Sequence, residues 1–205
     1  MATIKSGAST DVLTIGSTNK AARIEVYDAR GNSRGVKATY RAATAAVLVA
    51  AAGTGLFFAM QGSSTKTVRI QRIKLSGLTL TAVAYNSIQL AKYSTTVSGG
   101  TATALVATQF DTTDGAATAN LINVYTAAPT AGSLVGTLGS IRVLMQATTA
   151  AATGIPDIDI GWDFRNLHEV DQPTLRGTAQ GIALNFVSSP ASAVSLSLEV
   201  EWTEE

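Results

Sequence analysis

The sequence predicts an all-β protein, a jelly-roll-like antiparallel β-sandwich preceded by an extended N-terminal arm. Three observations support this fold. Apolar and polar side chains alternate with a period of two in many separate segments. Turn-rich stretches separate at least eight such segments between residues 47 and 202, as in sandwiches and jelly rolls. Helix signals are poor, because the 205 residues include 28 Thr, 18 Gly and 17 Ser, which lower helix propensity.

The first 40 residues differ from the rest. They hold two short apolar stretches, residues 12–15 and 22–27, and are too few to fold alone. We therefore expect an extended arm over residues 1–40 that adds strands to a neighbour or packs along its own domain. The remaining residues, 41–205, form the sandwich body, which is long enough to bury an independent core.

The body begins with two apolar segments. Residues 41–52 are rich in Ala and could form a helix of about three turns or a strand. The β-branched pair Val47 and Val49 favours the strand. Residues 55–60 are a short apolar run after a glycine, which predicts a strand buried on both faces.

The next segment, residues 68–75, alternates but slips by one position. Its apolar side chains fall at 68 and 70 and then at 73 and 75. A β-bulge near Gln71 and Arg72 would return both pairs to one face of the strand.

The later strand candidates alternate more regularly. The last two, residues 181–186 and 195–202, are joined by the turn-forming stretch 188–192, so we expect a hairpin. Exposed loops are expected at residues 94–101, 111–116 and 147–154. The other strand candidates are residues 87–92, 121–125, 141–145 and 157–164.

Composition excludes several classes of protein. The chain has no Cys, which excludes a disulfide framework, a thiolate metal site and a Cys nucleophile. It has no 18-residue apolar run and no visible secretory signal, so we expect no membrane span and folding in a reducing cytoplasm.

The charged residues are divided unevenly along the chain. Residues 1–74 carry eleven basic and three acidic side chains, and residues 75–205 carry four basic and eleven acidic ones. Such a split suits head-to-tail contacts or docking on an acidic surface. The basic residues lack interleaved aromatics, so no direct nucleic-acid binding is expected.

Few residues suggest chemistry. The single histidine, His168, could act as a general base, but no Gly-x-Ser-x-Gly elbow supplies a nucleophile. Asp157, Asp159 and Asp163 could line one strand face and bind Ca²⁺, although an EF-hand pattern is missing. Trp162 and Trp202 fall on apolar strand faces, which favours core packing over a sugar site. We therefore expect no catalytic, cofactor or metal site and no enzyme.

The opening, an early strand and the ending of the chain resemble a known family. The opening residues 1–11 and 21–28 resemble the N-termini of tailed-bacteriophage virion proteins. Residues 65–73, 175–185 and 200–205 look like the first core strand and the ending of small phage structural proteins. The resemblance spans most of the chain and implies a location in the virion, after synthesis in the host bacterial cytoplasm.

Together these observations lead to an expected function. We expect a capsid decoration or cement protein, a homo-oligomer with a trimer favoured, that binds phage capsid or other virion proteins. The alternatives are a tail- or fibre-associated module that binds a receptor or glycan, and a hydrolase using His168. The basic residues expected to make the partner contact are Lys5, Lys20, Arg23, Arg30, Arg34, Lys37 and Arg41.

Overall fold

The protein is described by a computed structural model that covers residues 14–15, 22–23, 37–49, 55–127, 129–147, 160–168 and 171–205. Within these ranges the chain forms strands and no α-helix, which confirms the all-β prediction. It divides into two compact units, Met1–Lys37 with Glu205, and Ala38–Glu204. The second unit begins three residues before the predicted start of the body, because the first core strand begins at Ala38.

The first unit contains one short antiparallel pair. Strand β1 (Thr14–Ile15) pairs with β2 (Ala22–Arg23), with Thr14 opposite Arg23 and Ile15 opposite Ala22. These strands fall within the two apolar stretches of the predicted arm. Of the rest of that arm, residues 37–40 are described, whereas Lys5, Lys20, Arg30 and Arg34 lie outside the described residues.

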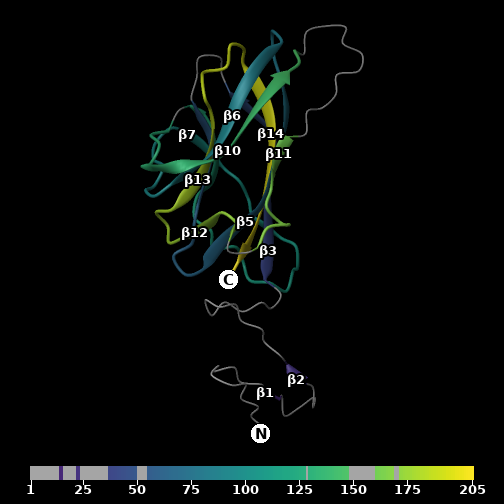
Figure 1. Ribbon diagram of the computed structural model, residues 1–205, viewed down its shortest axis with the longest axis vertical. Coiled ribbons are helices and arrows are strands. Elements are labelled where there is room, and N and C mark those ends of the chain that lie inside the picture. Colours follow the sequence, from purple (N-terminus) through teal and green to yellow (C-terminus); the bar gives the residue numbers. More distant parts are fainter. Residues whose placement is uncertain are drawn as a thin grey trace. The chain divides into compact units, whose positions relative to one another are not determined.

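The second unit consists of two antiparallel sheets (Figure 1). The β14 sheet has the order β11-β5-β14-β3-β8, with β12 paired to β5, and the β6 sheet has the order β10-β6-β13-β4-β9-β7. The strands of the β14 sheet are β3 (Ala38–Val49), β5 (Thr67–Thr79), β8 (Thr108–Gln109), β11 (Ile160–Asp163), β12 (Thr174–Arg176) and β14 (Val194–Glu204). The strands of the β6 sheet are β4 (Leu56–Gln61), β6 (Ala84–Tyr93), β7 (Thr101–Ala104), β9 (Ile122–Ala127), β10 (Leu134–Met145) and β13 (Gly181–Phe186).

The connections between the sheets follow the jelly-roll pattern. Strands β3, β5, β11 and β14 belong to one sheet and β4, β6, β10 and β13 to the other, so the chain repeatedly crosses between the layers. The last two strands insert beside early ones: β14 lies between β3 and β5, and β13 lies between β4 and β6. This arrangement places non-local pairs at the centre of both sheets.

The main core lies between the two sheets. Aromatic and aliphatic side chains from both layers are fully buried there, among them Trp202, Phe58, Ile70 and Leu184. The Trp202 ring stacks on Tyr40 with the ring centroids 5.8 Å apart. Alternation along β14 explains the arrangement, because Leu196, Leu198, Val200 and Trp202 share the inner face.

Three local predictions are confirmed. Residues 38–49 form a strand, which settles the described part of the Ala-rich segment in favour of β. Every residue of β4 is buried. In β5 the register against β14 shifts between Glu201 and Trp202, so Gln71 is the extra residue of a bulge. Val68, Ile70, Ile73 and Leu75 therefore all reach the main core.

The predicted hairpin over residues 181–202 is wrong. β13 pairs with β4 and β6, whereas β14 pairs with β3 and β5 in the opposite sheet. The turn between them carries the chain across the sandwich. Alternation identifies the buried face of each strand but does not say which strand lies beside it.

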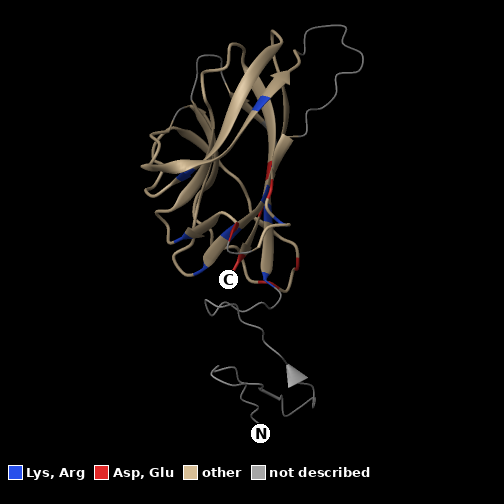
Figure 2. Ribbon diagram, in the orientation of Figure 1, with Lys and Arg blue, Asp and Glu red and all other residues tan. Residues whose placement is uncertain are grey.

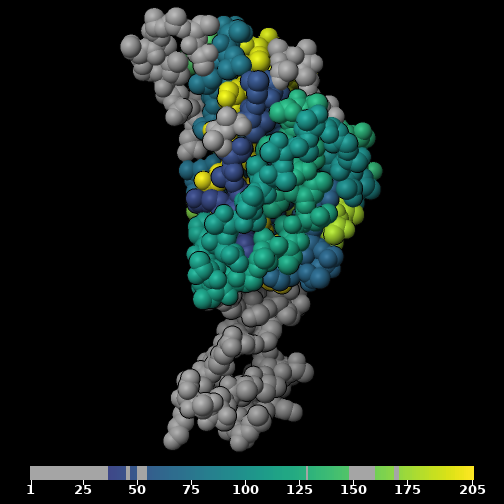
Figure 3. All heavy atoms as spheres, turned by 180° about the vertical axis from the view of Figure 1, so that it is seen from behind, coloured from purple at the N-terminus to yellow at the C-terminus, as the bar shows by residue number. Residues whose placement is uncertain are grey.

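The segment between β6 and β10 holds strands that the sequence did not suggest. It contains β7 and β8. Strands β9 and β7 lie beyond β4 at one edge of the β6 sheet, whereas β8 pairs with β3 in the β14 sheet. Val97 and Tyr125 of this segment join Leu56, Ala91 and Ala183 in a second, smaller apolar cluster. Figure 3 shows the segment, in teal to green, forming a broad part of the surface beside β3. Strand β12 was not among the predicted strands either.

Candidate functional site

A row of alternating charges crosses the β14 sheet. The register places Arg41 opposite Glu201, Glu201 opposite Arg72, and Arg72 opposite Asp163. Inner positions of these strands are apolar, so the row lies on the outer face. Figure 2 shows positive and negative residues mixed along β3, β5 and β14. We call Arg41, Glu201, Arg72 and Asp163 the charged row.

Arg41 and Asp163 of the charged row form ion pairs with side chains of opposite charge. Arg41 Nη2 donates to Glu201 Oε1 at 2.5 Å, and its Nη1 lies 3.6 Å from Glu199 Oε2. Arg165, just after β11, donates from Nε to both carboxylate oxygens of Asp163 at 3.0 and 3.1 Å. These hydrogen bonds, with the charges of Arg165 and Arg72, lower the pKa of Asp163 to about 2.

Part of the charge division seen in the sequence is brought together in the β14 sheet. Basic residues from the first 74 positions, such as Arg41 and Arg72, lie beside acidic residues from the C-terminal strand, such as Glu199 and Glu201. Antiparallel pairing of β3 and β5 with β14 brings the two groups together. Of the basic residues expected to face a partner, Lys37 and Arg41 form ion pairs within the chain.

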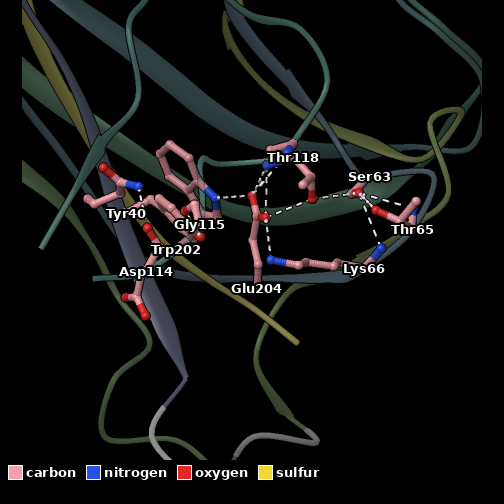
Figure 4. Close-up of polar contacts among 11 residues, drawn as sticks. Tyr40, Ser63, Thr65, Lys66, Asp114, Gly115, Thr118, Trp202 and Glu204 are labelled. Atoms are coloured by element: carbon pink, nitrogen blue, oxygen red, sulfur yellow. Dashed lines mark hydrogen bonds and ion pairs between the residues drawn. The ribbon is translucent and has the colours of Figure 1, made fainter. Parts of the chain in front are cut away.

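The end of β14 carries a buried carboxylate. Glu204 Oε1 accepts hydrogen bonds from Trp202 Nε1 at 3.0 Å and from the backbone N–H of Ala119 at 2.9 Å. Its Oε2 accepts from the backbone N–H and the hydroxyl of Thr118 at 2.9 and 2.7 Å. Lys66 Nζ lies 3.7 Å from the same oxygen (Figure 4). We call Glu204 with these partners the Glu204 clamp.

The Glu204 clamp is built for anchoring. Burial opposes ionisation, but the hydrogen bonds from Trp202, Thr118 and Ala119 outweigh it, so the pKa of Glu204 is lowered. Both oxygens are occupied by donors, which leaves no accessible lone pair for proton transfer to a ligand. The clamp ties the loop before β9 to the last strand, and the Tyr40 hydroxyl adds a hydrogen bond to the Gly115 carbonyl at 2.7 Å.

Within the described ranges, the residues considered for chemistry are not brought together. His168 is exposed in the turn after β11, and its imidazole makes no hydrogen bond to any described residue. Asp157 and Asp159 lie outside the described residues, and Asp163 is held by Arg165. Within the described ranges no group of three or more His, Asp or Glu side chains could hold a metal ion.

The two tryptophans pack inward. Trp202 is fully buried, and Trp162 is partly buried against the main core. Core packing was the favoured interpretation of both. Neither indole therefore presents an open ring face comparable to that of Tyr85 on β6, which is 65% exposed.

The residues predicted to contact a partner are only partly described. Arg23 lies in β2, Lys37 forms an ion pair with Glu205, and Arg41 belongs to the charged row. Arg41 is thus part of the body and not of the arm, and its guanidinium also lies 5.0 Å from the Phe110 ring.

One apolar surface was not singled out from the sequence. Leu134, Val135 and Leu138 at the start of β10 are 61%, 60% and 41% exposed. Tyr85 and Leu144 are opposite each other further along β6 and β10, and Arg142 stacks on the Tyr85 ring at 5.0 Å. The sequence feature that marks this surface is the uncharged run of residues 134–141. A strand was predicted only from position 141 onward.

Comparison with protein-family models, curated proteins and solved structures finds no match to this chain. The described part of the chain also contains no helix long and apolar enough to cross a membrane.

Proposed function

We propose that this chain is a structural protein of a bacteriophage virion, a decoration or cement component that binds the capsid or neighbouring copies of itself. It works by binding, since many modest contacts repeated over a particle add through multivalency. The resemblance of the two ends of the chain to phage virion proteins supports this proposal. The jelly-roll body supports it as well, because viral capsid domains use that architecture.

The observation that carries the proposal is a contrast between polar side chains, which are paired within the chain, and large apolar side chains, which are exposed. The Glu204 clamp and the charged row engage their polar groups inside the chain. Large aliphatic side chains are left exposed on β10. A body of this kind offers surfaces for protein contact and, within the described residues, no assembled catalytic group.

Co-sedimentation with separated phage heads and tails tests the proposal. Tagged protein should pellet with heads in a saturable manner. Binding to tails alone would move the protein to the tail-associated class, and binding to neither would contradict a virion role.

The arm is tested by truncation. We expect deletion of residues 1–36 to abolish head binding while the body stays folded, because β3 and its core residue Tyr40 are retained. A cut after residue 40 would remove Tyr40 from the core and confuse loss of binding with loss of folding. Full occupancy of heads by the truncated protein would contradict an anchoring arm.

A second candidate function is a glycan-binding module of the tail or fibre. Tyr85 is the observation that favours it, since an exposed ring on a sheet face can stack on a sugar. Glycan-array binding that is lost in Tyr85→Phe but kept in Val106→Ala would point to the hydroxyl. Loss only in Tyr85→Ala would point to the ring, and no binding by the wild type would reject this candidate.

A further inference from the structure

Residues 106–121 form a loop whose two ends are held together at its base. The flanking residues are Leu105 and Ile122, and the Leu105 N–H donates to the Ile122 carbonyl at 2.7 Å. Directly outside this bond, β7 pairs with β9. A surface loop with adjacent ends can move while the strands that carry it stay paired. We call residues 106–121 the strap.

The strap covers part of the edge of β3 and part of the main core. Its short strand β8 pairs with Tyr40 and Arg41 of β3 at the edge of the β14 sheet. Covering an edge strand with a loop keeps its backbone groups from pairing with other chains. Three alanines of the strap also pack against the main core: Ala107, Ala117 and Ala119.

The Glu204 carboxylate fastens the strap to the last strand through its charge. It accepts hydrogen bonds from the backbone N–H and hydroxyl of Thr118 and from the backbone N–H of Ala119 (Figure 4). Hydrogen bonds to an ionised acceptor are stronger than those between neutral groups. A protonated carboxyl carries a hydrogen on one oxygen, so at least one of these donors would lose its acceptor.

The strap ends in a strained residue. Leu121 has a φ of 48°, in the left-handed region, which is unfavourable for a leucine. The Gln61 N–H holds this position from the body, with the carbonyl oxygens of Asn120 and Leu121 each at 3.0 Å. The closed strap therefore stores backbone strain that its opening would release.

We propose that the strap opens as one unit when the Glu204 carboxylate takes up a proton, and that opening uncovers the edge of β3 and the core beneath it. Burial raises the pKa of Glu204, but hydrogen bonds from Trp202, Thr118 and Ala119 outweigh it and lower the pKa below its ordinary value of 4.5. The anchoring contribution of Glu204 is therefore complete above pH 4.5 and is lost as the pH falls through the lowered pKa.

The charged and titratable groups near Glu204 leave it as the group that responds to acid. Lys66 Nζ lies 3.7 Å from Oε2 and favours the ionised carboxylate. Burial and the charges of Glu204 and Asp114 raise the pKa of Tyr40, so that its hydroxyl stays protonated in acid. Asp111, in the strap, accepts hydrogen bonds from Thr113 of the strap itself, which lower its pKa. The proposal goes beyond the proposed function and does not depend on it.

The first test is hydrogen exchange of the full-length protein at pH 7, read by mass spectrometry. Glu204→Gln should speed exchange of the strap amides about tenfold or more, because the glutamine amide turns a donor toward the donors of the strap. The amides of β6 and β13 should keep their wild-type rates. Glu199→Gln is the matched control on the outer face of β14 and should change neither region.

Three outcomes of this test would overturn the proposal. They are an unchanged strap in Glu204→Gln, an equal effect of Glu204→Gln and Glu199→Gln, and equal acceleration in the strap and in β6 and β13. The last outcome would mean that Glu204 holds the whole body and not one segment.

The second test follows wild-type exchange at decreasing pH and needs no substitution at Glu204. After correction for the intrinsic pH dependence of exchange, the strap should open below pH 4.5 while β6 and β13 stay protected. Asp111→Asn is the control for the other strap carboxylate and should keep this response. The proposal is wrong if the strap loses protection only together with β6 and β13, or if Asp111→Asn removes the acid response.

Discussion

The two sheets of the body differ in how they carry charge. The strands of the β6 sheet contain two charged residues, both basic, and no acid. The strands of the β14 sheet contain both signs in nearly equal number. The members of these two sets are Lys92 and Arg142 for the first sheet, and Arg41, Arg69, Arg72, Lys74, Arg176, Asp163, Glu199, Glu201 and Glu204 for the second.

This difference shows two ways of treating the outer face of a sheet, by pairing charges in contact with water or by apolar cover. The outer face of the β14 sheet pairs its charges across neighbouring strands and can stay in contact with water. The β6 sheet has little charge to offer, so it relies on apolar cover. The segment between β6 and β10 supplies part of that cover through the cluster around Tyr125. Leu134, Val135 and Leu138 of β10 are left exposed by this segment.

The largest effect is expected at the Glu204 clamp. Glu204→Ala should lower the free energy of unfolding by about 3 kcal/mol, because it leaves the buried donors of Thr118, Ala119 and Trp202 without an acceptor. Chemical denaturation measures this loss. Glu199→Ala, on the water-facing side of the same strand, should lose less than about 1 kcal/mol. Equal losses would mean that the clamp does not anchor the loop.

The next effect is expected where β10 meets β11. A Cβ at Gly139 would lie 2.2 Å from Trp162 Nε1, whereas a Cβ at Gly136 would meet nothing within 4 Å. Gly139→Ala should therefore cost about 1–3 kcal/mol through overpacking, and Gly136→Ala should be close to neutral. Thermal unfolding of the two variants gives the comparison. Equal melting temperatures would show that Trp162 moves aside freely.

The pH dependence of stability tests the charged row. The folded pKa of Asp163 is about 2, below its ordinary value of 3.8. Its stabilising contribution is therefore complete above the ordinary value and is lost as the pH falls toward 2. Glu204, whose pKa is also lowered, acts in the same direction. In the Asp163→Asn variant, the free energy of unfolding should decrease less steeply between about pH 4 and 2 than in the wild type. An unchanged slope would contradict the pairing with Arg165.

The smallest effect is expected for one ion pair, Arg41 with Glu201, on the outer face of the β14 sheet. A double-mutant cycle with Arg41→Met and Glu201→Gln should give a coupling of about 0.5–1 kcal/mol, because the Arg41 side chain is partly exposed. Added salt should reduce this coupling. A coupling several times larger that resists salt would show that the row is effectively buried.

The fold class and most strand positions could be predicted because they depend on local pattern. The alternation of β14 and the slip in β5 each reflect a period of two, and the structure confirms both the strand and the bulge at Gln71. The short strands β7, β8 and β12 were missed, because they have no such alternation and depend on pairing with distant segments.

The surroundings of the candidate site residues were harder to predict from the sequence. Glu204 is close to Trp202 in sequence but is buried only because residues 118 and 119 fold over it. The exposure of Val135 and Leu138 depends on where β6 pairs with β10, which the residues of β10 alone do not reveal. Arg41 could be picked out as basic, but its partners come from the opposite end of the chain.

The sequence by itself determined that the chain is all-β, where its main strands lie and which face of each is apolar, because side-chain alternation is fixed by the geometry of the extended backbone. Only the tertiary structure decided which strands are neighbours. It therefore decided that the last two strands separate into opposite sheets, that acidic residues of β14 lie beside basic residues of β3 and β5, and that Leu134, Val135 and Leu138 of β10 face water, because strand pairing is non-local.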